Sequence, residues 1–572
     1  MSDASSPRPQ APAIMPLAPS SPSFRAADLP GRKLDQNERS ERVPHWLRAA
    51  LNALPDPDLW RYPDRRALEA DLADFYGLRE DQVLVSNGGD EAIQYLFADL
   101  PADTPIIAPL PTFGFYLEQC DVWPVRPVTL PVRDDLTLDI EAAFDAVAAN
   151  PGGIFILIRP NNPTGESIPR ETAQRLIAWC GQHDTRVLLD EAYAEFASDN
   201  LLDLLADNPH LIILRTFSKA YGLAGLRLGY LLADGELLNR LRRRVMPYNV
   251  SSVSLHLGRE ALKPQAQKEI TDYCEKVVAN RRRLFTLLSG WGIRVLPSES
   301  NFLMLDLGDR RANFIGKVMA MQGFAVRTFK RPGITGCVRF SVPVETAALE
   351  AALTLAFKPE LLCLDVDGTL IDVRASFDET VLRTVFHFCG LRPDRDEILA
   401  LRAAGGFNDD HVLSRELIRR HGADVPLEQV KAVFETLYFG DGTTPGTVTR
   451  ETPLIDARLL DRMRKEFRIA LVTGRNRREM APGIDLLGLD AGTPCYTVDD
   501  VTHPKPDPEG IRAASEVTGC RRVWMVGDNL DDIRAAVAAG AVPIGVGENR
   551  EALEKAGACA FFDHIDQIEE LL

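Results

Sequence analysis

Short, continuously apolar runs alternate with longer amphipathic stretches along most of this 572-residue chain. Runs of this kind, each followed by a turn or a helical pattern, are typical of strands buried on both faces of a parallel sheet. In the first half they are QVLVS (82–86), PIIAPL (105–110), GIFILI (153–158), RVLLD (186–190) and LIILRT (211–216). The pattern predicts an α/β fold built on a mostly parallel sheet.

A break at Lys358-Pro359-Glu360 divides the chain, because a helical pattern (345–357) ends there and a new apolar strand, LLCLDV, begins at 361. We expect a disordered tail over 1–28, which holds six prolines. A first unit should follow over 29–357, with a large domain at about 45–250 and a small α+β domain at about 251–357 that includes the N-terminal arm. The second unit, 358–572, has a mostly helical pattern at about 374–450 and strands RIALVT (468–473) and RVWMVGD (522–528).

The composition excludes several kinds of partner. The chain has 65 Lys and Arg against 82 Asp and Glu, a net charge of −17, so we expect no nucleic-acid partner. No apolar run reaches about 18 residues, which argues against a membrane span. The nine cysteines are scattered and none form a CxxC pair, which favours a reducing, cytoplasmic location.

A lysine with hydroxyl neighbours follows the strand that ends near 216. Lys219 lies beside Thr216 and Ser218, and Arg227 comes eight residues later. A lysine in this setting can form a Schiff base with pyridoxal phosphate, and the hydroxyls and the arginine can hold the cofactor's phosphate.

Other strand ends offer the remaining groups that such a cofactor needs. Asp190 ends a strand and can pair with the pyridinium nitrogen, while Tyr193 and Asn162 can hydrogen-bond the phenolic oxygen of the ring. The segment SNGGDEAI (86–93) places a glycine pair at a helix start, an arrangement suited to phosphate. Phe113, in PTFGFY (111–116), is a candidate to stack on the ring.

These motifs resemble fold-type I aminotransferases, and among them the histidinol-phosphate aminotransferases, over 34–357. The matching strings are LDQNE, RYP, SNGGDEAI, PTFGFY, RPNNPTG, LLDEAYAEF, LRTFSKAYGLAGLRLGY, NF (301–302) and VRTF…CVRFSV. The resemblance implies that Lys219 binds the cofactor covalently and transfers protons, and that Gly89 and Asp90 hold its phosphate through their backbones. It also implies that Tyr62 reaches into the neighbouring subunit's site of a homodimer.

The same resemblance implies that two arginines bind the substrate. Arg339 matches the clamp on the α-carboxylate of glutamate, a bidentate role that suits a guanidinium. Arg327, twelve residues earlier, matches the arginine that contacts the phosphate of a phosphorylated amino alcohol. One motif departs from the family: Asn37-Glu38-Arg39-Ser40 stands where Asn-Glu-Asn-Pro is usual. That loop helps to shape the substrate pocket, so the substrate stays open between an imidazole compound and another aromatic or phosphorylated one.

A pair of carboxylates ends the first strand of the second unit. LLCLDVDGTLID (361–372) contains Asp365 and Asp367, whose repulsion Mg²⁺ can relieve. One carboxylate can attack phosphorus, and the other can protonate the leaving oxygen. Thr473 can bind a phosphate oxygen, Lys505 offers a fixed cation, and Asp528 can complete the metal site.

This order of motifs resembles the haloacid dehalogenase superfamily over about 360–572, a Rossmann-like domain with a helical cap. The resemblance implies that Asp365 is the nucleophile and Asp367 the general acid/base, that Asp532 supports the metal site of Asp365, Asp367 and Asp528, and that the cap closes over substrate. GGFNDD (405–410) is either a substrate-binding loop or an ordinary turn between helices.

The two activities fit consecutive steps of histidine synthesis, in which transamination makes histidinol phosphate and a phosphatase then releases histidinol. The sequence leaves two alternatives open. The aminotransferase can act on another aromatic or phosphorylated compound beside a phosphatase of different scope. The second unit can also be a non-catalytic regulatory module, although its complete motif set argues against this.

Overall fold

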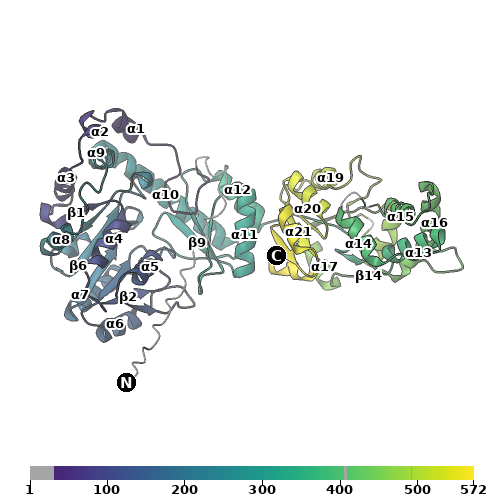
Figure 1. The fold of residues 1–572 in the computed structure, drawn as a ribbon, viewed down its shortest axis with the longest axis horizontal. Coiled ribbons are helices and arrows are strands. Elements are labelled where there is room, and N and C mark those ends of the chain that lie inside the picture. Colours follow the sequence, from purple (N-terminus) through teal and green to yellow (C-terminus); the bar gives the residue numbers. More distant parts are fainter. Residues whose placement is uncertain (1–30, 405–406, 408, 491) are drawn as a thin grey trace, which may run out of the picture. The chain divides into compact units, whose positions relative to one another are not determined.

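The computed structural model describes residues 31–404, 407, 409–490 and 492–572, which form two compact units (Figure 1). Unit 1 comprises 31–312 and 319–346, and unit 2 comprises 313–318 and 347–572. The predicted tail at 1–28 lies outside the described residues, as do positions 405, 406 and 408 of the predicted loop at 405–410.

Unit 1 is built on a seven-stranded sheet of order β1-β7-β6-β5-β4-β2-β3. Only β7 runs antiparallel to its neighbours, β1 and β6, among the pairs of this sheet. The strands are β1 (Val83–Ser86), β2 (Pro105–Pro109), β3 (Arg126–Leu130), β4 (Ile154–Ile158), β5 (Arg186–Asp190), β6 (Leu211–Thr216) and β7 (Gly229–Leu232). All five runs predicted as strands are present, and the mostly parallel α/β class is confirmed.

Helices connect and cover these strands because the chain must cross over between parallel neighbours. They are α1 (His45–Asn52), α2 (Pro57–Trp60), α3 (Arg66–Tyr76), α4 (Gly89–Ala98), α5 (Phe115–Val122), α6 (Ile140–Ala149), α7 (Arg170–Gln182), α8 (Gly235–Arg242), α9 (Ser252–Ala261) and α10 (Pro264–Gly290). Apolar residues of the sheet and of α4 and α8 form one buried core.

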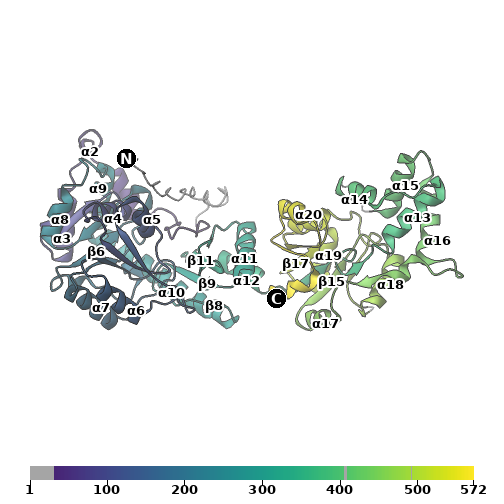
Figure 2. The same ribbon diagram turned by 60° about the horizontal axis from the view of Figure 1, so that its bottom comes forward.

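A second, four-stranded sheet of order β10-β11-β9-β8 follows α10. It contains β8 (Arg294–Val295), β9 (Phe302–Asp306), β10 (Arg327–Thr328) and β11 (Cys337–Ser341), and β8, β9 and β11 can be followed in Figure 2. The N-terminal arm runs alongside this sheet, since the amide of Ser341 donates to the backbone oxygen of Leu34. The arm thereby brings residues 35–37 next to the first sheet's strand ends.

Unit 2 has a six-stranded sheet, order β16-β15-β12-β17-β18-β19, in which every pair is parallel. The strands are β12 (Leu361–Leu364), β15 (Arg468–Val472), β16 (Cys495–Tyr496), β17 (Val523–Gly527), β18 (Val542–Val546) and β19 (Ala560–Phe562). They are flanked by α17 (Ala457–Glu466), α18 (Arg477–Leu486), α19 (Glu509–Thr518), α20 (Leu530–Ala539) and α21 (Arg550–Ala556), and Figure 2 shows α19 and α20 beside β15 and β17.

A helical cap is inserted between β13 (Ile371–Asp372) and β14 (Thr452–Pro453), two short strands that pair antiparallel. It contains α13 (Phe377–Cys389), α14 (Arg395–Ala404), α15 (Asp410–Arg420) and α16 (Leu427–Phe439). Helices α13, α15 and α16 lie together (Figure 1). The β13–β14 pair carries both crossings of the chain between the cap and the core.

The helix predicted to end the first unit, α12 (Ala347–Phe357), packs with the second. Its Leu355 carbonyl accepts a hydrogen bond of 3.0 Å from the indole of Trp524, whose ring also contacts Phe314 of α11 (Asp309–Met321) edge-on. Among the described residues, no helix combines the length and the apolar character needed to cross a bilayer.

Candidate functional site

Lys219 follows β6 and meets the N-terminal arm. Its Nζ donates to the backbone oxygen of Gln36 at 3.0 Å. Burial lowers the pKa of Lys219 to about 8, and the guanidinium of Arg339 acts in the same direction. More of the side chain is then neutral near pH 7, and only the neutral amine is a nucleophile. The lysine is therefore suited to the covalent role predicted for it.

Asp190 ends β5 and is buried. Its Oδ2 accepts a hydrogen bond from the Tyr116 hydroxyl at 2.8 Å, and its Oδ1 accepts from the backbone N–H of Ala192 at 3.0 Å. Burial raises the pKa of Asp190 to about 6, and the bond from Tyr116 opposes this shift. An ionised carboxylate in this place can hold a protonated pyridine nitrogen.

Tyr193 lies between the N-terminal arm and the second sheet and contacts both. Its hydroxyl accepts a hydrogen bond of 3.0 Å from Asn37, and its ring contacts Phe302 edge-on. Asn37 has a positive φ of 57° and its backbone oxygen accepts from Asn301 at 3.0 Å. The sequence pointed to Asn37 only as part of a loop near the substrate, and its contact with Tyr193 comes from the tertiary structure.

Helix α4 begins at Gly89, next to the end of β6. The first amide groups of a helix have no backbone acceptor within it, so they can bind an anion. A Cβ on Gly229 would lie 2.7 Å from the backbone of Gly88 and of Gly89. Only glycine at 229 lets β7 and the helix start approach this closely.

The predicted phosphate ligands are gathered at the same place. Thr216 Oγ1 donates to Ser218 Oγ at 2.9 Å, and Arg227 Nη2 donates to the Asp90 carboxylate at 2.8 Å. A Cβ on Gly88 would lie 2.7 Å from that same Nη2 of Arg227. Hydroxyls, a guanidinium and helix amides form a donor set that fits a phosphate group, so the residues present fit pyridoxal phosphate.

The other predicted cofactor residues differ in placement. Phe113 is half-buried and meets Tyr116 edge-on with ring centroids 6.1 Å apart. Asn162 Oδ1 accepts from Arg339. Tyr62 is 79% exposed and stacks on Tyr248, also exposed. Within one chain Tyr62 is thus not part of the buried site.

The two arginines predicted to bind substrate face each other across a strand pair. Arg327 of β10 is the direct partner of Arg339 of β11, so both side chains lie on one face of the sheet. Arg339 is buried, donates to Asn162 and to the Asp35 backbone oxygen (2.9 Å), and has an Nε without a hydrogen-bond partner. Burial lowers the pKa of Arg339 to about 10. A buried guanidinium with a free donor fits a carboxylate ligand.

In unit 2, Lys505 contacts two carboxylates, that of Asp365 just after β12 and that of Asp532 in the first turn of α20. Its Nζ lies 2.6 Å from Asp365 Oδ1, 2.6 Å from Asp532 Oδ1, and 2.9 Å from the Val472 backbone oxygen. Burial, and then the nearby charge of Asp532, raise the pKa of Asp365 to about 7. Burial opposes the charged form of Lys505, but Asp365 and Asp532 outweigh it and raise its pKa.

One oxygen each from Asp365, Asp528 and Asp532 lies within 4.8 Å of the others. Burial, with the charges of Asp365 and Asp532, raises the pKa of Asp528 well above its usual value. A Cβ on Gly368, where φ is +74°, would lie 2.1 Å from Asp528. Three crowded oxygen donors fit a hard divalent cation such as Mg²⁺.

The structure places Asp367 outside this group of three. Its Oδ1 accepts from Nε of Arg475 at 2.7 Å. Thr473 directly follows β15 and is buried, with its Oγ1 accepting from the amide of Arg475 at 3.2 Å. The sequence analysis predicted Asp367 as a metal ligand together with Asp365 and Asp528, and it did not single out Arg475. Only the LVTGR string beside Thr473 could have suggested that residue.

The comparison with known families decides the class of unit 1. The model for "Aminotransferase class I and II" matches residues 32–354. The chain belongs to the class I and II aminotransferases. A second model, "haloacid dehalogenase-like hydrolase", matches residues 359–540 of the same chain. The chain is therefore a pyridoxal-phosphate-dependent aminotransferase followed by a haloacid dehalogenase-like hydrolase domain, as the two sets of motifs predicted.

Curated relatives match the aminotransferase part. A histidinol-phosphate aminotransferase of Roseiflexus castenholzii is 34% identical over 354 residues, which are 59% of this chain and 93% of the relative. One of Thermococcus gammatolerans is 38% identical over 280 residues, 48% of this chain and 78% of the relative. An aromatic amino acid aminotransferase of Cutibacterium acnes is 33% identical over 308 residues, 53% of this chain and 86% of the relative.

Solved structures agree with this fold. The histidinol-phosphate aminotransferase of Sinorhizobium meliloti in complex with pyridoxal-5'-phosphate has a TM-score of 0.50 at 26% identity, covering 57% of this chain and 92% of that one. The histidinol-phosphate aminotransferase of Clostridium acetobutylicum has a TM-score of 0.51 at 19% identity, covering 56% and 97%.

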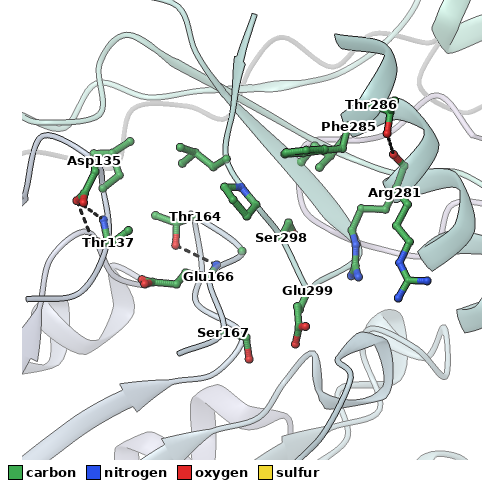
Figure 3. A pocket seen from close by; sticks show the side chains of 16 residues that line it. Asp135, Thr137, Thr164, Glu166, Ser167, Arg281, Phe285, Thr286, Ser298 and Glu299 are labelled. Atoms are coloured by element: carbon green, nitrogen blue, oxygen red, sulfur yellow. Dashed lines mark hydrogen bonds between the residues drawn. The ribbon is translucent and has the colours of Figure 1, made fainter. Parts of the chain in front are cut away.

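A cavity of about 580 Å³ in the aminotransferase unit lies beside the loop after β4 (Figure 3). Glu166 and Ser167 line it from that loop, Arg281 and Phe285 from α10, and Glu299 from the segment before β9. None of the predicted cofactor or substrate residues lines it. The cavity is thus a separate feature, and the candidate site lies instead where β5, β6, α4 and the arm meet.

Proposed function

We propose that the chain catalyses two consecutive reactions. The first is transamination between glutamate or 2-oxoglutarate and the pair imidazole acetol phosphate and histidinol phosphate. The second is Mg²⁺-dependent hydrolysis of histidinol phosphate. The observation that carries the first is the pairing of Arg327 with Arg339, because two guanidiniums on one face suit a site that takes both a carboxylate and a phosphate. The names of the relatives support the same substrate.

In the aminotransferase unit, bound pyridoxal phosphate supplies an electron sink. Lys219 binds the cofactor and moves the proton at the substrate carbon that carries nitrogen. Asp190 holds the pyridine nitrogen protonated, and the Tyr116 bond orients that carboxylate. Arg339 binds the carboxylate of glutamate, and Arg327 binds the phosphate of the other substrate.

In the hydrolase unit, Asp365 attacks phosphorus while Asp367 protonates the leaving oxygen; Asp367 then takes a proton from a water molecule, which attacks the phosphoryl group and releases phosphate from Asp365. Thr473 and Lys505 bind the phosphoryl oxygens. Asp365 and Asp528, with Asp532 close by, would hold Mg²⁺, which offsets the charge of the phosphate. The product of the first reaction carries the phosphomonoester that the second one removes, so hydrolysis draws a nearly thermoneutral transamination forward.

The relative from Cutibacterium acnes favours a second candidate, an aromatic amino acid aminotransferase beside a phosphatase of another scope. The departure at Arg39 is compatible with either candidate, since its guanidinium lies over the Tyr273 ring, 3.9 Å from the centroid.

We also propose a cytoplasmic homodimer. Tyr62 and Tyr248 are exposed, together with Trp60 and Met246, and a second copy would cover these side chains. All nine cysteines are free, which suits a reducing compartment. Sedimentation equilibrium of the full chain should give twice the chain mass, and a monomer at micromolar concentration would refute the dimer.

Arg327→Ala tests the substrate. It should lower kcat/KM for histidinol phosphate by about 10- to 100-fold, the effect of losing one charge-assisted contact, and should spare an unphosphorylated aromatic amino acid. Arg339→Ala should instead impair the half-reaction with glutamate. Arg294→Ala is the control, because it removes an exposed arginine of the same sheet that pairs with Asp306.

Equal losses for phosphorylated and unphosphorylated substrates would make Arg327 structural and would favour the second candidate. The phosphatase substrate is tested separately, by phosphate release from a panel of phosphorylated metabolites with the Lys219→Ala chain, which cannot transaminate. Histidinol phosphate should be among the best substrates. If the chain releases no phosphate from any member of the panel, the hydrolase unit is a regulatory module.

A further inference from the structure

Arg475 connects the general acid/base to the rest of the hydrolase unit. Its side chain is fully buried. Nε donates to Asp367 Oδ1 at 2.7 Å, and Nη2 lies 2.6 Å from the same oxygen. On the other side of the guanidinium, Nη1 donates to Glu451 Oε2 and to the Glu479 backbone oxygen, each at 3.1 Å. One rigid group thus joins two carboxylates.

Glu451 lies where the chain returns from the cap. It directly precedes β14, and its side chain is only 2% exposed. Its Oε1 accepts from Ser376 Oγ at 3.0 Å and from the Tyr438 hydroxyl at 2.8 Å. Ser376 belongs to the outgoing crossing and Tyr438 to cap helix α16. This carboxylate therefore touches both crossings, the cap and, through Arg475, the core.

Electrostatics makes these contacts interdependent. Buried charges are stable only when they are paired, so removing one partner leaves another uncompensated. The guanidinium is planar and its donors are fixed relative to one another. A shift of α16 or of Ser376 that moves Glu451 must therefore move Arg475, and with it the side chain of Asp367. Phe377 adds a packing link, because its ring lies tilted against that of Tyr438, with centroids 4.5 Å apart, and 5.0 Å from the Arg475 guanidinium.

We propose that Arg475 and Glu451 are positioning residues that make the orientation of Asp367 depend on the position of the cap. The inference rests on the proposed phosphatase activity. In that reaction an oxygen of Asp365 bonds to phosphorus, the P–O bond to the leaving group breaks, and a proton carried by Oδ2 of Asp367, the oxygen that does not accept from Arg475, passes to the leaving oxygen. This pair, Glu451 and Arg475, is called the relay below. It aligns the proton donor Asp367 only when the cap holds Glu451 in place. When the cap is displaced and solvent or a wrong substrate can enter, Asp367 is therefore not aligned to protonate a leaving group.

The test uses two substrates that differ in their need for an acid. An alkyl phosphate such as histidinol phosphate leaves as an alkoxide that must be protonated, whereas p-nitrophenyl phosphate leaves as a stable phenolate. General acid catalysis contributes roughly 10²–10⁴-fold where it is needed. Glu451→Gln should therefore lower the ratio of kcat/KM, alkyl over p-nitrophenyl, by at least about 10-fold. Tyr438→Phe, which removes one hydroxyl, should move the ratio in the same direction by less.

Asp378→Asn is the matched control. Asp378 lies on cap helix α13, and its side chain is nearly as buried as that of Glu451. It pairs with Arg395 and Arg402. Its loss should lower the thermal unfolding temperature by a similar amount and leave the substrate ratio unchanged. Because Tyr438→Phe is nearly isosteric, it remains informative if Glu451→Gln does not fold.

The outcomes separate the two proposals. If the wild-type chain hydrolyses neither substrate, the proposed phosphatase fails, and the relay with it. If the wild type hydrolyses both and Glu451→Gln and Tyr438→Phe lower both rates equally, the phosphatase stands and the relay is only structural. A lowered ratio in these two variants, with an unchanged ratio in Asp378→Asn, supports the positioning role.

Discussion

Asp190 and Asp365 show how the same residue at the same kind of strand end acquires two chemical roles. Both are buried, and burial raises the pKa of each. Asp190 accepts from a neutral hydroxyl, that of Tyr116, and so can take up the positive charge of a pyridinium. Asp365 lies against an ammonium, that of Lys505, and beside two other carboxylates, which suits a metal and a phosphate.

The pKa of Asp190 predicts a pH dependence. The affinity of the cofactor-free protein for pyridoxal phosphate should fall as pH is lowered through about 6, because protonation removes the charge that attracts the pyridinium. The bond from Tyr116 lowers this pKa, so Tyr116→Phe should move the midpoint to higher pH. Absorbance titrations of both proteins between pH 5 and 8 would measure the midpoints.

The ionisation of the cofactor's own phosphate is common to both proteins, so the difference between them isolates Asp190. Tyr273→Phe removes another buried tyrosine hydroxyl, on α10, and should leave the midpoint in place. A midpoint that Tyr116→Phe does not move, or moves to lower pH, would contradict the role assigned to Tyr116.

At the scale of elements, the cofactor cradle depends on how closely β7 approaches the start of α4. Gly229 pairs with Ser86 of β1 and Thr216 of β6, so it lies between the two strands whose ends carry the phosphate ligands. A side chain there meets backbone, which cannot move aside as a flexible side chain can.

Gly229→Ala should therefore displace the helix start and weaken binding of pyridoxal phosphate by about 10-fold or more, the equivalent of the 1–3 kcal/mol typical of overpacking. Gly225→Ala is the control, because a Cβ at Gly225 meets nothing within 4 Å. Fluorescence titration of the two apo-proteins measures the effect, and circular dichroism checks the fold. Equal affinities would show that the approach of β7 does not shape the cradle.

At the scale of the whole molecule, one chain carries two units, each with its own set of chemical groups. The residues that would bind pyridoxal phosphate all lie in unit 1, and those that would bind Mg²⁺ and phosphate all lie in unit 2. A substitution that abolishes the reaction of one unit should therefore leave the reaction of the other unit intact.

Lys219→Ala should abolish transamination and the visible absorbance of bound cofactor, yet leave phosphate release intact. Asp365→Asn should lower phosphate release by several orders of magnitude and spare transamination, as loss of a covalent nucleophile does. EDTA should stop phosphate release alone. Coupled assays of glutamate and phosphate on the full chain would measure both rates. Transamination by Lys219→Ala at the wild-type rate, or phosphate release that resists EDTA, would overturn the assignment.

The sequence by itself determined the fold class, the strands that carry the chemistry, and the residues that follow them. Buried parallel strands read as apolar runs, and their carboxyl ends meet at one edge of a sheet, so residues such as Asp190, Lys219 and Asp365 can be placed without coordinates. Within the first sheet, β3 and β7 were not predicted; RPVTL of β3 is largely exposed, so it does not form a continuously apolar run.

Only the tertiary structure decided which side chains meet. Arg327 faces Arg339 because of strand register, which sequence spacing does not reveal. Tyr116 reaches Asp190 across 74 positions, and Arg475 reaches Asp367 across 108. Such contacts depend on side-chain direction in elements far apart in the chain. For the same reason helix α12, which follows the first unit in sequence, packs with the second.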